Sequence, residues 1–308
     1  MTTDRRNEPI QKLLSGSLIC DGAMGTGGLL ICDGAMGTTL SAAGHLAGRS
    51  LELMNVEEPD LVRAAHHAYL DAGADVIETN TFQGSRPVLE RHGLGERTVE
   101  FNRAGAVLAK EAAGGKAFVA GSIGPTGRIL EPYGEFEPEA ARAAFEEQAQ
   151  ALADGGVDFL IVETFTAVEE VALAVRAAAA TGLPIAASMS FDPNGRTIFG
   201  VLPKRAADEM AAAGAVVVGA NCGTVTPMEM VTILEQFRAA TKLPLIAQPN
   251  AGRPEKTESG TRFPATPEEV AEAAPRFRDL GATIIGGCCG TRPEHIQAIV
   301  ARLRGSQQ

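Results

Sequence analysis

The stretch Gly286-Gly-Cys-Cys-Gly-Thr291 places two adjacent cysteines directly after an apolar run, Thr283-Ile-Ile285. Adjacent side chains on an extended strand point to opposite faces, so both sulfurs can meet one ion only where the backbone turns sharply. The flanking glycines permit such a turn. The stretch therefore predicts a buried strand that ends in a turn carrying two sulfur ligands.

A third cysteine follows another apolar run. Cys222 lies in Ala220-Asn-Cys-Gly-Thr224, behind Val216-Val-Val218. Three sulfurs at two strand ends suit a catalytic zinc, which takes three protein ligands and keeps one position open. The alternatives for these cysteines are small buried side chains without a ligand, or a redox pair formed by the adjacent Cys288 and Cys289.

Composition narrows the class of protein. The chain has 308 residues, a hydrophobic content of 45% and a net charge of −11. No long basic tract is present, so we expect no nucleic acid partner. No apolar run reaches the roughly 20 residues of a membrane helix, and no signal peptide is recognisable. Five cysteines, an odd number, favour reduced thiols in a cytoplasmic protein over a disulfide framework.

Eight short apolar runs, rich in β-branched residues, have the length of strands. Their near-continuous apolar character predicts strands buried on both faces, as in parallel sheets, and the intervals leave room for a helix each time. We therefore predict an α/β fold, a single (β/α)8 TIM barrel, with an open doubly wound sheet as the alternative. The runs are Leu30–Cys32, Val76–Glu78, Ala117–Ala120, Phe159–Val162, Ile185–Ser188, Val216–Gly219, Leu245–Ala247 and Thr283–Ile285.

Helical patterns fill the intervals. Pro59 is placed to be a first helical residue, followed by a stripe of Leu61, Ala65 and Tyr69. His66 and His67 lie in the middle of the same pattern, and we expect both at the solvated surface. A second stripe is formed by Ala141, Phe145, Ala149 and Leu152.

Three segments share the pattern of a threonine followed three residues later by glutamate, which is typical of a helix N-terminus closed by a capping box. They are Thr226–Glu229, Thr266–Glu269 and Thr291–Glu294.

In a barrel, chemistry belongs at the carboxyl ends of the strands. Those ends are polar and glycine-rich here. The Gly121–Gly127 segment lacks the spacing of a phosphate-binding loop, so phosphate is not expected. The strand-end segments are Asp33–Thr38, Glu78–Phe82, Gly121–Gly127, Glu163–Phe165, Ser190–Asp192, Asn221–Gly223, Pro249–Gly252 and Gly286–Gly290.

This ordered set of strand-end motifs resembles the homocysteine S-methyltransferase family from about Ser17 to Leu303. The likeness is greatest to the homocysteine module at the N-terminus of cobalamin-dependent methionine synthase, and betaine–homocysteine methyltransferase is related. The motif Asn221-Cys222 together with Gly287-Cys-Cys-Gly290 carries the resemblance.

The resemblance implies residue roles. Cys222, Cys288 and Cys289 would bind zinc, and the sulfur of homocysteine would take the fourth position. The carboxylates of Asp33 and Glu163 would bind the amino-acid end of homocysteine.

Asn221 would support that site, and Thr81 and Asn250 are further candidates for lining the pocket. Zinc coordination deprotonates a thiol, and the thiolate is the nucleophile, so the resemblance implies methyl transfer to homocysteine to form methionine.

The methyl donor is not encoded in one barrel. Betaine and S-methylmethionine are cations of the kind that aromatic cages hold, and the chain has no Trp and only two Tyr, Tyr69 and Tyr133. We therefore expect a methyl-corrinoid donor, with cobalamin carried by a partner domain or protein. The alternatives are betaine or S-methylmethionine as donor, or a non-catalytic thiol-binding subunit of a corrinoid complex.

A duplicated segment complicates the first strand. Leu18–Thr26 recurs word for word as Leu30–Thr38. Copy two continues without interruption into Thr39-Leu40, whereas copy one is followed by the flexible Gly27-Gly28. We therefore expect copy two to form the first strand, with Asp33 rather than Asp21 at the substrate.

The chain's organisation and its two remaining cysteines can also be assigned. We assign residues 1–16 to an N-terminal extension and residues 17–308 to the homocysteine-binding barrel domain. Cys20 and Cys32 are expected in the core rather than at the metal.

Overall fold

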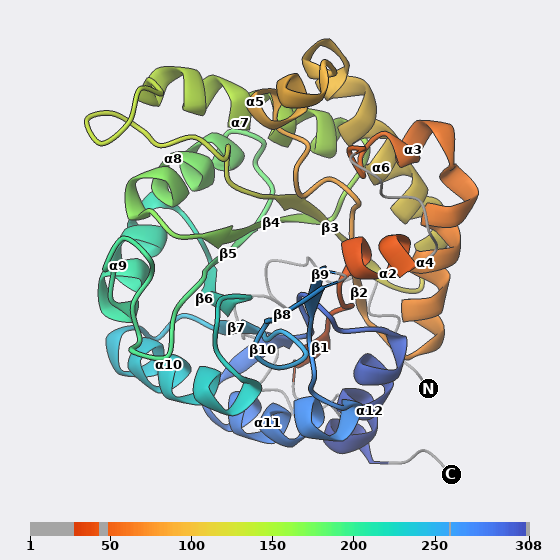
Figure 1. Ribbon diagram of the computed structural model, residues 1–308, viewed down its shortest axis with the longest axis vertical. Coiled ribbons are helices and arrows are strands. Elements are labelled where there is room, and N and C mark those ends of the chain that lie inside the picture. The colour runs from red at the N-terminus through yellow and green to blue at the C-terminus, as the bar shows by residue number, and fades with distance from the viewer. Residues whose placement is uncertain (1–27, 43–48, 259, 306–308) are drawn as a thin grey trace.

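A computed structural model of the chain describes residues 28–42, 49–258 and 260–305. Within them eight parallel strands form a central barrel surrounded by helices (Figure 1), which confirms the predicted TIM barrel. All eight predicted strands are present. They are β1 (Leu30–Ile31), β2 (Val76–Glu78), β3 (Phe118–Ile123), β4 (Phe159–Phe165), β5 (Ile185–Met189), β6 (Val217–Asn221), β7 (Leu245–Gln248) and β10 (Ala282–Ile285).

The barrel closes between its first two strands. The hydrogen-bonded order is β1-β10-β7-β6-β5-β4-β3-β2, and Cys32 forms a parallel bridge with Val76. The amide of Asp33 donates to the carbonyl of Val76 over 3.0 Å, and the amide of Asp75 donates to the carbonyl of Ile31 over 2.7 Å. Because strand one meets strand two, the alternative of an open doubly wound sheet is wrong.

Helices cover the outside of the barrel. One short helix and two 3₁₀ turns lie between β2 and the next long helix. The helices are α2 (Met36–Ala42), α3 (Met54–Glu57), α4 (Pro59–Asp71), α5 (Arg86–Leu89), α6 (Thr98–Ala113), α7 (Pro138–Asp154), α8 (Val168–Ala179), α9 (Pro203–Ala213), α10 (Pro227–Ala240), α11 (Pro267–Asp279) and α12 (Pro293–Arg304), with 3₁₀ turns η3 (Glu90–His92) and η4 (Gly95–Arg97).

Two apolar clusters hold these layers together. The barrel interior contains one inward residue or two from each strand, among them Phe159, Ile161 and Ile246. The larger cluster lies between strands and helices and includes Phe145 of the predicted α7 stripe, which is confirmed as a buried face. Burial on both sides of each strand explains why the strand runs are apolar throughout.

The buried face of α4 confirms two residues of the predicted stripe, Ala65 and Tyr69, whereas Leu61 is only half-buried. Pro59 is the first helical residue, as expected, but Val62, Ala65, His66 and Tyr69 are the buried residues. The expectation of a solvated His66 is therefore wrong, and only His67 is exposed. Burial lowers the pKa of His66 to about 3, so its ring is neutral at physiological pH.

The capping boxes at Thr226 and Thr266 are confirmed, but the one predicted at Thr291 is wrong. In the first two, proline directly follows threonine and starts the helix. In the third, Pro293 comes one residue later, so Arg292 takes the cap position and its amide donates to His295 Nδ1 over 3.2 Å. This shift leaves the hydroxyl of Thr291 available to the cysteine turn.

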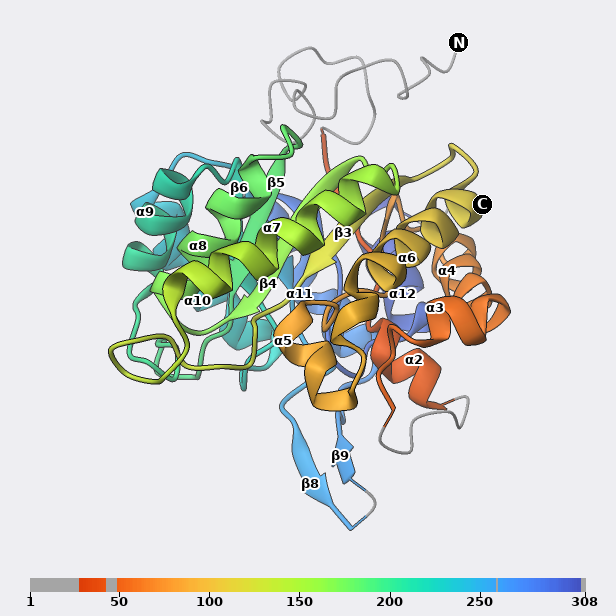
Figure 2. The same cartoon turned by 90° about the horizontal axis from the view of Figure 1, so that it is seen from above.

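A two-stranded antiparallel hairpin, β8 (Glu255–Thr257) with β9 (Gly260–Arg262), interrupts the segment between β7 and α11. It projects from the barrel on the side where β7 ends (Figure 2). Its residues are exposed, and the charged sequence gave no apolar signal that would have predicted it.

The structure describes the second copy of the duplicated segment. Leu30 and Ile31 of copy two form β1 and pair with Ile284 and Ile285, as predicted. Copy one, including Cys20 and Asp21, lies outside the described residues, as does the extension assigned to residues 1–16. In the part of the chain that is described, no helix combines the length and the apolar character needed to cross a bilayer.

Candidate functional site

Three sulfurs meet at the carboxyl ends of β6 and β10. Cys222 follows β6, Cys288 and Cys289 follow β10, and the three Sγ atoms all lie within 4.8 Å of one another. Cys222 Sγ and Cys289 Sγ are 3.8 Å apart. Tetrahedral zinc with Zn–S bonds of about 2.3 Å separates its sulfur ligands by about 3.8 Å, so these residues fit a zinc ion.

Backbone geometry brings the sulfurs together. Cys222 has a φ of 55° and Gly223 a φ of 78°, so the chain reverses immediately after β6. At the other turn the amide of Cys288 donates to the carbonyl of Pro249 over 2.8 Å. A Cβ on Gly287 would lie 2.4 Å from Thr291 Oγ1, which explains the glycine at this position.

The Thr291 hydroxyl connects the cysteine turn to the first strand's loop. It donates to the carbonyl of Cys288 over 2.6 Å and accepts from the amide of Ala35 over 3.2 Å. The hydroxyl that sequence reasoning assigned to a helix cap thus positions the two cysteines.

The thiols are not equivalent. Hydrogen bonds from Cys222 and Cys288 lower the pKa of Cys289 to about 4, whereas sharing of a proton with Cys222 and burial raise the pKa of Cys288. Cys289 is therefore the most readily ionised of the three thiols, and the thiolate is the form of cysteine that binds a metal.

A cavity of about 240 Å³ opens over the sulfurs. Cys222, Cys288 and Cys289 line it together with two further predicted residues, Glu163 and Thr81. The remaining predicted residues, Asp33, Asn221 and Asn250, are not among its lining residues. Asp33 and Asn221 bond to the lining residues Glu78 and Glu163, and Asn250 bonds to Gly223, next to Cys222.

Asp33 is buried below the cavity, with 1% of its surface exposed. Its Oδ2 accepts a hydrogen bond of 3.0 Å from the amide of Glu78, and the thiol of Cys32 lies 3.6 Å from its Oδ1. Burial raises the pKa of Asp33 to about 8. Cys32 is buried in the barrel interior, as expected.

The side chain of Asn221 forms hydrogen bonds to residues of two other strands, β4 and β5. Its Oδ1 accepts from the amide of Thr164 over 2.8 Å and from the hydroxyl of Ser188 over 2.7 Å. Its Nδ2 donates to Glu163 Oε2 over 3.2 Å and lies 3.8 Å from Cys288 Sγ. The side-chain amide of Asn250 instead donates to the carbonyl of Gly223 over 2.9 Å, in the turn that carries Cys222.

Sequence reasoning missed Glu78 as a site residue. It lines the cavity from β2, together with Glu163 from β4. Burial and the charge of Asp33 raise the pKa of Glu78 to about 7, and burial with the charge of Glu78 raises the pKa of Glu163. Its position at the end of a strand run was the available signal.

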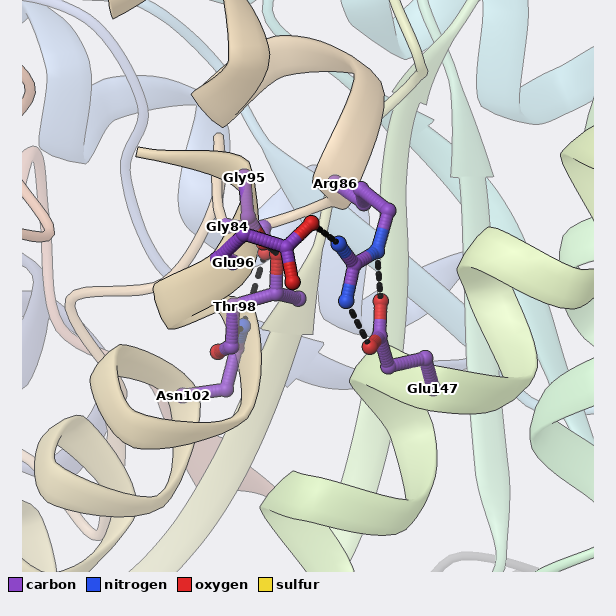
Figure 3. Close-up of polar contacts among 7 residues, drawn as sticks. All are labelled: Gly84, Arg86, Gly95, Glu96, Thr98, Asn102 and Glu147. Atoms are coloured by element: carbon purple, nitrogen blue, oxygen red, sulfur yellow. Dashed lines mark hydrogen bonds and ion pairs between the residues drawn. The ribbon is translucent and has the colours of Figure 1, made fainter. Parts of the chain in front are cut away.

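The wall that follows β2 is anchored from outside the barrel. The side-chain amide of Asn102 donates to the carbonyl of Gly84 over 2.7 Å (Figure 3). The guanidinium of Arg86 donates two hydrogen bonds to the carboxylate of Glu147 and one to that of Glu96. Gln148 donates to the carbonyl of Thr81 over 2.8 Å. These bonds hold the segment that carries Thr81 against α6 and α7.

Comparison with known proteins identifies the family of the chain. A family profile described as homocysteine S-methyltransferase matches residues 30–303. The chain belongs to the homocysteine S-methyltransferase family. The matched range begins at β1 and includes all three cysteines.

Individual members of the family show the same likeness. The chain is 32% identical over 305 residues to methionine synthase of Mycobacterium leprae. The aligned region covers 95% of this chain and 25% of that protein. It is 35% identical over 269 residues to betaine–homocysteine S-methyltransferase 1 of Mus musculus, covering 80% of this chain and 65% of that protein. The chain thus spans about a quarter of the methionine synthases that it matches.

A solved structure has the same architecture. The metallated form of the homocysteine methyltransferase MmuM from Escherichia coli superposes with a TM-score of 0.75 at 27% identity, covering 89% of this chain and 96% of MmuM. Its oxidized form gives a TM-score of 0.74 at 28% identity.

Proposed function

We propose that this chain is a zinc-dependent methyltransferase that transfers a methyl group to the thiol of homocysteine, forming methionine, with a methyl-corrinoid as donor. The observation that carries this proposal is the group of three sulfurs in one cavity, two of them 3.8 Å apart. Membership of the homocysteine S-methyltransferase family and the activities for which its relatives are named support homocysteine as the acceptor.

Cys222, Cys288 and Cys289 would hold the zinc, and the cavity above them would receive the fourth ligand. Bound zinc supplies one chemical effect, which is to lower the pKa of a coordinated thiol so that the acceptor sulfur is a thiolate at neutral pH. The chain's own residues then orient the acceptor.

The carboxylate of Glu163 would bind the acceptor's ammonium group, and Asn221 would keep that carboxylate in place through its bond to Oε2. Among the described residues that line the cavity there is no lysine, arginine or histidine to compete for it. In the transfer, a bond forms between the acceptor sulfur and the methyl carbon while the bond from carbon to donor breaks. The electron pair of that bond leaves with the donor, and the thiol proton leaves to solvent.

The cavity lining supports a corrinoid donor over a small cation. Phe82 is the one aromatic side chain among the described lining residues, whereas an aromatic cage for a quaternary ammonium uses several rings. Tyr69 is buried beside α2, and Tyr133 is exposed in the segment between β3 and α7.

The decisive experiment combines metal content with activity. We expect one zinc per purified chain and methionine formation from homocysteine with methylcobalamin, compared in parallel with S-methylmethionine and betaine. X-ray absorption should show an additional sulfur neighbour of zinc when homocysteine is added, and homoserine should not cause this change.

Each outcome decides a part of the proposal. Turnover with S-methylmethionine or betaine and none with methylcobalamin would replace the donor while keeping the acceptor. Zinc and homocysteine binding without turnover from any donor would identify a thiol-binding subunit. Equal methylation of homoserine would contradict the activation of a thiol by zinc. Activity in a zinc-free protein would contradict a role of zinc in the reaction.

A further inference from the structure

The floor of the cavity contains a second carboxyl group beside Glu163. Glu78 at the end of β2 lines the same cavity as the three cysteines and as Glu163 from β4, and its charge raises the pKa of Glu163. Asp33 lies directly behind, with its Oδ2 bonded to the amide of Glu78. Three carboxyl groups thus gather below the point where an acceptor must enter.

Glu78 is held in place from two other strands. Gln248 Nε2, at the end of β7, donates to Glu78 Oε1 over 2.6 Å. The thiol of Cys32, just after β1, donates to the same oxygen over 3.4 Å. Because a single oxygen accepts both bonds, the carboxyl group is fixed in orientation while its other oxygen is free of these two donors.

The floor has hydrogen-bond donors to its carboxyl groups but no positive charge beside them. Neighbouring buried carboxylates destabilise one another unless one of them takes up a proton or a cation lies between them. No basic side chain is found among the described residues that line the cavity. In addition, Gln248 is 1% exposed. The Nε2 of its side-chain amide bonds Glu78, whereas the Oε1 of the same amide has no hydrogen-bond partner.

An ammonium group would satisfy these needs together. It carries one positive charge and three N–H donors, and buried acceptors without a donor cost free energy. The charge would relieve the repulsion between Glu78 and Glu163, and the donors would serve their carboxylate oxygens.

We propose that Glu78 is a second residue that binds the ammonium group of the acceptor amino acid, and that Gln248 is the residue that positions its carboxylate. This inference rests on the proposed function, since it names groups that select the acceptor at the same site. Its consequence is specificity. The site discriminates an aminothiol from a thiol without an amino group by means of two carboxylates rather than one.

The test compares homocysteine with 4-sulfanylbutanoate, which has the same chain and carboxylate but no amino group. The full-length zinc-loaded protein is assayed with methylcobalamin, and kcat and KM are measured for both acceptors. We expect Glu78→Gln to raise KM for homocysteine by about tenfold or more and to leave KM for 4-sulfanylbutanoate within about twofold. Zinc content should stay at the wild-type value.

Glu170→Gln is the matched control. Glu170 is also a buried carboxyl group, but it lies on α8 and accepts bonds from the amide and hydroxyl of Thr126, away from the cavity. Its substitution should leave the preference for homocysteine unchanged. Gln248→Met keeps Glu78 but removes the bond to it, and should reduce the same preference by a smaller factor.

Binding measurements keep the inference separate from turnover. Calorimetric titration with methionine and with 4-(methylsulfanyl)butanoate measures the preference for the amino group without any methyl transfer. If wild type shows no turnover with any donor, the proposed function fails, yet a methionine preference that falls in Glu78→Gln still supports this role.

Two results would overturn the role of Glu78. One is a loss of both acceptors in equal proportion in Glu78→Gln, which would indicate a purely structural side chain. The other is an unchanged preference for homocysteine in that variant. If Glu78→Gln does not fold, the preference measured in Gln248→Met decides, and an unchanged value there overturns the proposal.

Discussion

Asn221 Nδ2 donates a hydrogen bond to Glu163 Oε2 over 3.2 Å, which joins the end of β6 to the end of β4 below the sulfur cluster. Asn221 immediately precedes Cys222, so the residue that orients the carboxylate also fixes the start of the turn that carries a sulfur. In the proposed function, the same strand end would therefore set the position of the acceptor's ammonium group and that of its sulfur.

This relationship predicts the effect of Glu163→Gln. We expect weaker acceptor binding with unchanged zinc content, because Glu163 makes its bonds to Ser122 and Asn221 rather than to the metal ligands. Loss of a buried charge-assisted hydrogen bond costs about 1.5–3 kcal/mol, equivalent to about ten- to a hundredfold in affinity. Steady-state KM and zinc analysis measure both quantities. An unchanged KM would return Glu163 to a structural role.

Removal of a single sulfur should abolish metal binding. We expect Cys289→Ala to lose zinc and methyl transfer while its circular dichroism spectrum stays that of a folded barrel, because Cys289 lies at the rim of the barrel rather than in its core. Cys32→Ala is the matched control, since Cys32 is buried inside the barrel and should be dispensable for zinc. Full zinc retention in Cys289→Ala would exclude the three-sulfur site.

The duplicated segment gives a prediction about two aspartates. Deletion of residues 18–29 should leave activity nearly intact, because β1 and its contacts come from copy two. Asp33→Asn should weaken acceptor binding, whereas Asp21→Asn should not. The reverse pattern, measured as KM for homocysteine, would show that the first copy supplies the working aspartate.

The buried carboxyl groups predict a pH dependence of stability. Burial raises the pKa of Asp33 from 3.8 to about 8, so above pH 4 the folded state binds more protons than the unfolded state. The free energy of unfolding therefore falls as the pH rises toward 8. In zinc-free protein we expect a lower Tm at pH 8 than at pH 5.5, and a smaller difference in Asp33→Asn.

Scanning calorimetry in the presence of a chelator at each pH keeps metal loss from contributing. A Tm that rises from pH 5.5 to pH 8, or an identical difference in wild type and Asp33→Asn, would contradict a buried and largely protonated Asp33.

Much of the fold could be predicted from local patterns. The eight apolar runs were sufficient to place all eight barrel strands, because a strand buried on both faces must be apolar along its whole length. The helix start at Thr226 was equally local, since its threonine, proline and glutamate interact within one turn. Where the proline moved by one residue, at Pro293, the same pattern failed.

The sulfur ligands could be named from the sequence because each cysteine follows a strand and parallel strands end at one face of a barrel. Glu78 and Gln248 could not be assigned. They are 170 residues apart, and nothing local distinguishes them from other polar residues at strand ends. His66 was misjudged for the same reason, because the neighbours that bury it come from elements far away in the chain.

The sequence by itself determined the barrel, its eight strands, and Cys222, Cys288 and Cys289 as candidate metal ligands, since periodicity and strand-end position are local properties. Only the tertiary structure decided the 3.8 Å separation of Cys222 and Cys289, the bond from Asn221 to Glu163, and the pairing of Glu78 with Gln248. The physical reason is that barrel closure and burial set these distances and raise the carboxyl pKa values. Both depend on contacts between strands far apart in the chain.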